Sequence, residues 1–312
     1  MLQKLIIDTD PGQDDAVAIL LALASPEFDL LGITTVAGNV PLDLTTINAR
    51  KICDLAGRPD CLVFVGQDRP LARPLVTAEH VHGRTGLDGT DMPPPQTPVQ
   101  GTPAVDFLIN SIREHPAGAV TIATLGPLTN LGLALQQAPD IAPRIGQVVM
   151  MGGGFFEGGN ITVAAEFNIY VDPDAADIIF RSGIPIVMMP LDVTHKVLTH
   201  QRRIDRFAGL GNETGRQVAN MLSFSERFDE EKYGTDGGPL HDPCTIAWLL
   251  APELFSGRHC NVVIETRSEL TLGMTVIDWW RVSDRAPNAH VMRDVDDDGF
   301  FALLASRLAT LP

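Results

Sequence analysis

Short apolar runs alternate with longer amphipathic segments along the first two-thirds of the chain. The apolar runs have the length of buried strands, and the segments between them repeat apolar residues at helical spacing. The expected strands cover residues 4–8, 30–36, 62–65, 119–123, 147–151 and 184–189. The expected helices cover residues 14–24, 42–55, 104–114, 128–137 and 173–181. This rhythm predicts an α/β fold with a mainly parallel open sheet and helices on both faces.

The last third has a different pattern, with longer helices and fewer strands. It predicts helices over residues 213–232, 244–250 and 299–309, and strands over residues 261–265 and 270–276. A loop rich in Pro and Gly covers residues 68–102. Because no repeat or flexible linker divides the chain, we expect a single domain over residues 1–312.

Composition and charge narrow the possible partners. The chain has 23 basic and 39 acidic residues, a net charge of −16 that would repel a phosphate backbone, so polymeric nucleic acid is not expected as a partner. No apolar run reaches the length of a membrane span, and the run at the start is too short for a secretory signal. We therefore expect a cytoplasmic protein with no membrane partner. The four cysteines have no CxxC spacing and predict neither a disulfide scaffold nor a zinc site.

Four carboxylates lie within eight residues where the first strand ends and the first helix begins: Asp8, Asp10, Asp14 and Asp15. They would repel one another strongly unless protons or a cation neutralised them. Oxygen ligands without Cys or paired His favour a hard cation, and the open mixture of ligands favours Ca²⁺ over Mg²⁺. The alternative is that Asp14 and Asp15 only cap the following helix, which would explain two of the four acids.

A strand followed by Asp-x-Asp also resembles the start of haloacid-dehalogenase-like phosphatases. Those enzymes have Thr or Val two residues after the second Asp, whereas this chain has Gly12 followed by a further acid pair. The phosphatase interpretation therefore remains only a weak alternative.

Polar residues also follow the later strands, and the carboxyl ends of parallel strands are where open sheets bind ligands. Asn39 follows the second strand, and a turn containing Leu125 and Gly126 follows the fourth. Two amides and a carboxylate suited to sugar hydroxyls come further along, with an aromatic residue among them: Asn160, Glu166, Phe167 and Asn168. The pair His241-Asp242 precedes Pro243, a pattern that also fits an ordinary capped helix.

Together these segments resemble the inosine–uridine-preferring nucleoside hydrolase family. The match includes DTDPGQDDAVAIL, TTVAGNV, VHGRTGLDG, LGPLTN, MMGGG, GGNITVAAEFNIYVDPDAA, LDVTHK and LHDP, in the family's order. The resemblance implies Ca²⁺-dependent hydrolysis of the N-glycosidic bond of free ribonucleosides, with pyrimidine-preferring or mixed specificity. It also implies a homodimer or homotetramer. A calcium- and ribose-binding protein that has lost turnover is the alternative of another class.

The resemblance assigns roles to particular positions. Calcium would be bound by Asp10, Asp15, Asp242 and the backbone carbonyl of Leu125. The sugar would be held by Asp14, Asn39, Asn160, Glu166 and Asn168, with Phe167 between them.

Cleavage through an oxocarbenium-like transition state would use Asp10 to take the proton of a metal-activated water. His241 is the expected acid for the leaving base, and His82 is placed in the base pocket. The segment 223–233 resembles a closing lid, in which Phe228 would stack on the base.

Overall fold

The structure is a computed structural model that describes residues 2–234 and 236–312, and the backbone alone for residues 226–233. Its main sheet has eight strands in the order β3-β2-β1-β4-β5-β6-β12-β9. Every pair in this sheet is parallel except β12 with β9. The strands are β1 (Gln3–Thr9), β2 (Phe28–Thr35), β3 (Val63–Val65), β4 (Val120–Thr124), β5 (Ile145–Met151), β6 (Ile186–Met189), β9 (Phe255–Cys260) and β12 (Ala289–Val295). The predicted mainly parallel α/β fold is therefore confirmed.

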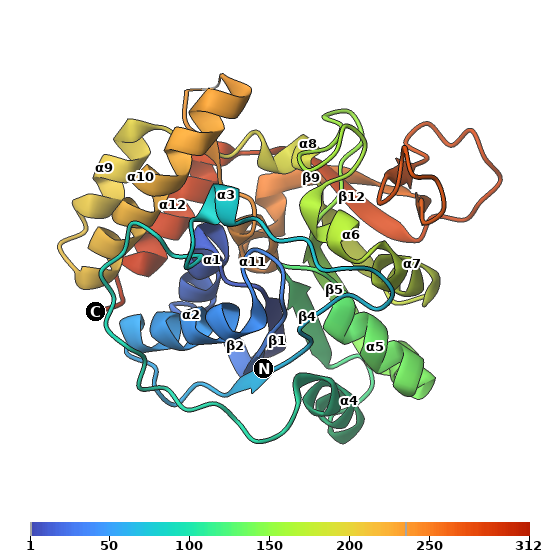
Figure 1. Ribbon diagram of the computed structural model, residues 1–312, viewed down its shortest axis with the longest axis horizontal. Coiled ribbons are helices and arrows are strands. Elements are labelled where there is room, and N and C mark those ends of the chain that lie inside the picture. The colour runs from blue at the N-terminus through green and yellow to red at the C-terminus, as the bar shows by residue number, and fades with distance from the viewer. Residues whose placement is uncertain (1, 235) are drawn as a thin grey trace.

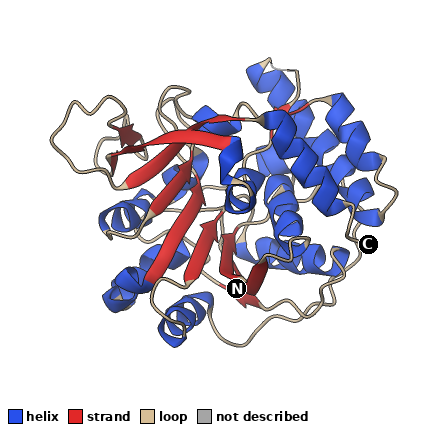
Figure 2. Ribbon diagram, turned by 180° about the vertical axis from the view of Figure 1, so that it is seen from behind, coloured by secondary structure: helices blue, strands red, loops and turns tan. Residues whose placement is uncertain are grey.

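Helices cover both faces of this sheet (Figures 1 and 2). One layer contains α1 (Gln13–Leu23), α2 (Leu42–Leu55), α9 (Gln201–Ala208), α10 (Glu213–Tyr233), α11 (Pro243–Leu250) and α12 (Asp297–Leu308). The other contains α4 (Ala104–Glu114), α5 (Thr129–Gln137), the 3₁₀ turn Pro139–Arg144 and α7 (Pro173–Arg181). Shorter elements are α3 (Glu79–His82), α6 (Phe167–Val171), α8 (Leu191–Thr194), the 3₁₀ turn Pro252–Leu254, and the small pairs β7 (Leu198–Thr199) with β8 (Gly238–Pro239) and β10 (Val262–Ile264) with β11 (Thr275–Ile277).

The two layers of helix produce two hydrophobic cores, one on each face of the sheet. In β1, Leu5 and Ile7 face the first core and Ile6 faces the second, and all three are fully buried. Strands buried on both faces have no polar side, which is why they appear in the sequence as continuous apolar runs.

The sequence prediction failed mainly in the last third. The predicted strand over residues 270–276 is wrong for most of its length, because Gly273 has φ +78° in a turn and only β11 is extended. Strands β9 and β12 were missed. Strand β9 lies at the edge of the sheet and carries exposed polar side chains, and β12 beside it contains His290, Arg293 and Asp294, so neither forms an apolar run. Helix α9 was also missed, since Ile204 and Phe207 are its only buried residues.

Candidate active site

The acidic segment lies at the carboxyl edge of the central strands. Asp8 is paired in register with Thr34 of β2 and Thr124 of β4, so three strands end side by side. The backbone N–H of Leu125 then donates to the carbonyl of Asp8 at 2.8 Å. This pairing brings the first and fourth strand ends together, as predicted for a parallel sheet.

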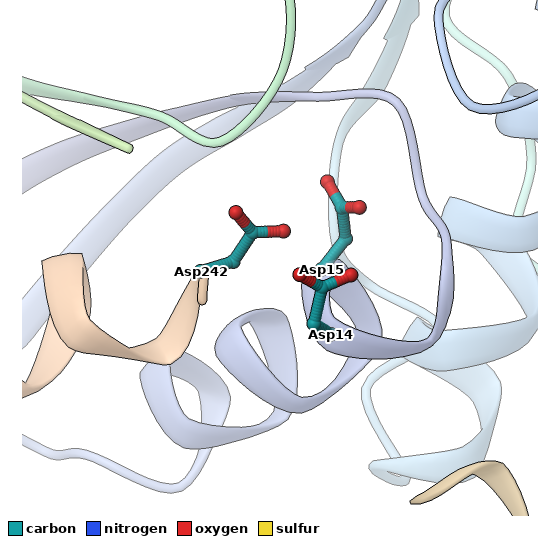
Figure 3. A group of neighbouring side chains, drawn as sticks. All are labelled: Asp14, Asp15 and Asp242. Atoms are coloured by element: carbon teal, nitrogen blue, oxygen red, sulfur yellow. The ribbon is translucent and has the colours of Figure 1, made fainter. Parts of the chain in front are cut away.

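Three carboxylates from two helix starts face one another here (Figure 3). Asp14 and Asp15 come from the first turn of α1, and Asp242 lies directly before α11, which packs against α1. One oxygen from each lies within 4.8 Å of the others. The carboxylate of Asp15 also accepts the backbone N–H of Gly12 at 3.0 Å, so capping does account for one of its oxygens.

Asp10 and Asp8 lie beside this group and are fully buried. The backbone N–H of Asn39 donates to Asp10 Oδ2 at 2.7 Å, while Asp10 Oδ1 has no hydrogen-bond partner among the described residues. Thr34 and Asn130 donate to Asp8 Oδ1 at 2.6 and 2.7 Å. Asp8 is thereby tied to β2 and α5 through one oxygen, and its other oxygen, like Asp10 Oδ1, is buried without a hydrogen-bond partner among the described residues.

Burial raises the pKa of every acid in this cluster. It raises the pKa of Asp8, Asp14 and Asp15 to about 6. The pKa values of Asp10 and Asp242 are raised well above the usual range, first by burial and then by the neighbouring carboxylates. The cluster is thus poorly neutralised by the protein's own groups.

These features fit a hard cation. The donor set consists only of oxygens, and buried oxygens of Asp8, Asp10 and Asp14 lack partners among the described residues. The carbonyl of Leu125 accepts a hydrogen bond from Asn168 Nδ2 at 2.7 Å and keeps a second lone pair. The acid cluster therefore forms a candidate metal site.

A cavity of about 100 Å³ opens beside the acids. It is lined by most of the predicted substrate residues, namely Asp14, Asn39, His82, Asn160, Glu166, Phe167, Asn168 and His241. Segments far apart in the sequence supply the rest of the wall, namely Gln13, Ala78, His80, Val81, Met151, Ile161, Thr199, Leu222, Ser225, Pro239 and Leu240. The structure thus gathers the predicted amides, acids and histidines around one space.

The amide side of the cavity is rigidly held. Glu166 caps α6 and accepts backbone N–H groups of Asn168, Ile169 and, at 2.8 Å, Gly153. Burial raises its pKa to about 7. Asn160 Oδ1 accepts the backbone N–H of Phe167 at 2.8 Å. Each polar group is therefore fixed in place before any ligand arrives.

The two histidines predicted for the site, His82 and His241, line the cavity from different segments. His82 ends α3 in the long loop, and its Nδ1 lies 2.7 Å from Gln13 Oε1. Burial lowers the pKa of His82 to about 4. The Nδ1 of His241 lies 2.7 Å from the hydroxyl of Thr194, which belongs to α8.

Some residues of the cavity wall were not predicted from the sequence, and the side chain of one predicted residue is not among those described. The side chain of Phe228 falls outside the described side chains, so its role in a lid stays a prediction. Thr199 and Ser225 also line the cavity but were not predicted, because an isolated Thr or Ser gives no signal in a single sequence. Gln13 also lines the cavity, but it was not predicted because the signal of this motif comes from the surrounding aspartates.

Known proteins resemble this chain over nearly its whole length. The model of the "Inosine-uridine preferring nucleoside hydrolase" family matches residues 5–302. The chain is 56% identical over 309 residues to an uncharacterised protein of Schizosaccharomyces pombe, covering 99% of this chain and 100% of that one. It is 48% identical over 310 residues to the pyrimidine-specific ribonucleoside hydrolase RihA of Citrobacter koseri, covering 99% of each. The solved purine-preferring ribonucleoside hydrolase of Gardnerella vaginalis superposes with a TM-score of 0.92 at 34% identity, covering 98% of each chain.

Fold, site and these comparisons define an enzyme that cleaves N-glycosidic bonds. The chain belongs to the inosine-uridine preferring nucleoside hydrolase family, and it is a ribonucleoside N-glycosyl hydrolase. The resemblance seen in the sequence is confirmed, and the phosphatase alternative is wrong. None of the described helices is long and apolar enough to cross a membrane.

Proposed function

We propose that this enzyme hydrolyses pyrimidine ribonucleosides to ribose and base in a Ca²⁺-dependent reaction. The observation that carries the proposal is the cavity that joins the acid cluster, through Asp14, to the amides and histidines of the opposite walls. The preference for pyrimidines is supported by the higher identity to the pyrimidine-specific RihA, 48%, than to the purine-preferring structure, 34%.

Asp10, Asp15, Asp242 and the carbonyl of Leu125 are the proposed ligands of the cation. Asp14, whose carboxylate faces Asp15 and Asp242, lies between this set and the cavity. When bound, Ca²⁺ would neutralise the acids, hold ribose hydroxyls and lower the pKa of a coordinated water. Asp8, which is held by Thr34 of β2 and Asn130 of α5, would support the neighbouring ligands without binding the ion itself.

Asp10 is the proposed general base. Its Oδ2 is fixed by Asn39, which leaves Oδ1 free to take a proton from the attacking water. Gly38 and Gly126 enclose the carboxylate so tightly that a Cβ on either would lie about 2 Å from its oxygens. Asp10 is thus held in one orientation.

Asp14, Asn39, Asn160, Glu166 and Asn168 are proposed to bind the ribose, with Phe167 forming the apolar part of that wall. A carboxyl group with a pKa near 7, as in Glu166, can donate or accept a hydrogen bond at neutral pH. Negative charge around the sugar would also stabilise the oxocarbenium-like transition state.

His241 is proposed to protonate the departing base. Its Nδ1 lies 2.7 Å from the hydroxyl of Thr194, and its side chain lines the cavity in which the base would leave. His82 completes the base pocket. A single domain and a homodimer or homotetramer remain part of the proposal, and light scattering of the purified enzyme tests the latter.

Release of free base from a panel of nucleosides tests this function. We expect kcat/KM to be highest for uridine and cytidine, lower for inosine, and roughly 10⁴-fold lower for 2′-deoxyuridine, because the site would lose a hydroxyl that it pairs. Comparable cleavage of uridine and 2′-deoxyuridine would refute the ribose assignment. Binding of nucleosides without any base release would instead support the non-catalytic alternative.

A further inference from the structure

Gln13 connects the first helix to the long loop through three hydrogen bonds, two of them to His82. Its Oε1 lies 2.7 Å from His82 Nδ1, and its Nε2 donates to the carbonyls of His82 at 3.0 Å and Asp88 at 3.3 Å. The side chain is 1% exposed. Although Gln13 is buried next to four aspartates, these hydrogen bonds of its side chain all go to another segment of the chain.

These three contacts fix which nitrogen of His82 carries the proton. Backbone carbonyls only accept hydrogen bonds, so the amide NH₂ of Gln13 must face the two carbonyls. Its oxygen therefore faces Nδ1, and an amide oxygen also only accepts. Nδ1 must then be the donor, which leaves Nε2 of the neutral imidazole as an acceptor.

Packing keeps the ring in this orientation. A Cβ on Gly12 would lie 2.5 Å from His82 Nδ1 and 2.8 Å from Cε1, so the ring lies directly against the Gly12 backbone. The backbone N–H of His82 donates to Ala78 at 3.0 Å, and that of Ala78 donates to the carbonyl of Asn39 at 2.9 Å. Rotating the ring would break the bond between Nδ1 and Gln13.

We propose that Gln13 is a positioning residue that holds His82 as a neutral hydrogen-bond acceptor, whose Nε2 receives an N–H or O–H group of the bound nucleoside. The inference rests on the proposed function. It assigns His82 to substrate selection rather than to proton donation, because its one proton is committed to Gln13. Burial, which keeps the pKa of His82 near 4, agrees with a neutral ring, and Asp15 and His80 are the titratable groups that act on it. Protonation of the leaving base then falls to His241.

The tautomer can be measured directly in the calcium-loaded enzyme without substrate. Long-range ¹H–¹⁵N spectra of protein labelled in histidine distinguish a protonated from a bare ring nitrogen, and His82→Gln assigns the signals by their loss. We expect Nδ1–H in the parent and in Gln13→Glu, which keeps an acceptor, and a shift toward Nε2–H in Gln13→Met, which has none. If Gln13→Met does not fold, Gln13→Ser, which is too short to reach the ring, replaces it. Nε2–H in the parent, or an unchanged tautomer without the Gln13 acceptor, overturns the proposal.

Kinetics identify the donor on the substrate. Uridine, 3-methyluridine (without N3–H) and 5′-deoxyuridine (without the 5′-hydroxyl) are compared in the parent, Gln13→Met and Gln13→Glu. We expect roughly a tenfold penalty in kcat/KM for the analogue that lacks the donor. That penalty should largely disappear in Gln13→Met and persist in Gln13→Glu, whereas a purely steric penalty would persist in all three. Equal penalties in parent and Gln13→Met overturn the acceptor role. Failure of the parent to cleave any nucleoside would refute the proposed function, while the spectra would still decide the tautomer.

Discussion

The acid end and the histidine wall of the cavity are built in different ways. The acid end comes largely from residues 8–15, at the end of β1 and the start of α1, with Asp242 added by α11. The histidine wall is assembled from α3, β7, α10 and the residues before α11. The acid end is formed mostly by residues that are neighbours in the sequence, whereas the histidine wall is formed by the packing of distant segments. We infer that bond cleavage depends on the acid end for every substrate, whereas the histidine wall acts differently on different bases.

Removal of the metal should have the largest effect and should not depend on the base. Chelation is expected to abolish turnover of all nucleosides and to lower Tm, because the uncompensated acids repel one another. Activity and Tm measured before chelation, after it, and after Ca²⁺ is restored provide the check. Full activity after exhaustive chelation would contradict the metal assignment.

Asp10→Asn should reduce kcat by roughly 10²–10⁴-fold on purine and pyrimidine nucleosides alike, since the amide cannot take a proton. Calcium affinity measured by calorimetry separates this loss from weaker metal binding. Asp192→Asn is a matched control, because Asp192 is also a buried acid after a strand end but only accepts backbone N–H groups of residues 155–157. Near-normal turnover in Asp10→Asn would remove Asp10 from the base role.

His241→Ala should slow the hydrolysis of some substrates much more than that of others. Hydrolysis of natural nucleosides should slow by roughly 10²–10⁴-fold, whereas a riboside with p-nitrophenolate as leaving group should react at close to the parent rate, because that group needs little protonation. Rates on both substrates are compared in the same preparation. Equal losses would mean that His241 supports Asp242 or ribose binding instead.

The smallest effect is expected in the stability of the metal-free enzyme. Because the folded pKa values of Asp8, Asp14 and Asp15 are raised to about 6, the folded protein binds more protons than the unfolded chain between about pH 4 and 6. Their contribution to stability is therefore present at low pH and is lost as the pH rises through this window. Tm measured from pH 4.5 to 6.5 should fall in metal-free parent protein and fall less in Asp242→Asn, which removes one repelling charge. An equal slope in the two proteins would contradict the electrostatic account of the cluster.

Much of the fold could be predicted because its central strands are buried on both faces. Such strands must be apolar throughout, and the helices between them must have one apolar side, so both leave a clear pattern. Strands β9 and β12 could not be found in this way, because polar residues interrupt both: β9 is an edge strand with an exposed polar face, and β12 carries His290, Arg293 and Asp294. The short helices α3 and α6 gave no periodic signal, although they carry His82 and the Phe167–Asn168 pair.

The sequence by itself determined the acid end. Four carboxylates around Pro11 and Gly12 lie together in any fold that ends a strand there, and their repulsion requires a cation or protons. Only the tertiary structure decided that Asp14 faces Asp15 and Asp242, that Asp10 keeps one open oxygen, and that Gln13 reaches across to His82. These contacts join residues as many as 228 positions apart, Asp14 and Asp242. Contacts over such separations arise from packing of helices and loops, which a local pattern of residues does not encode.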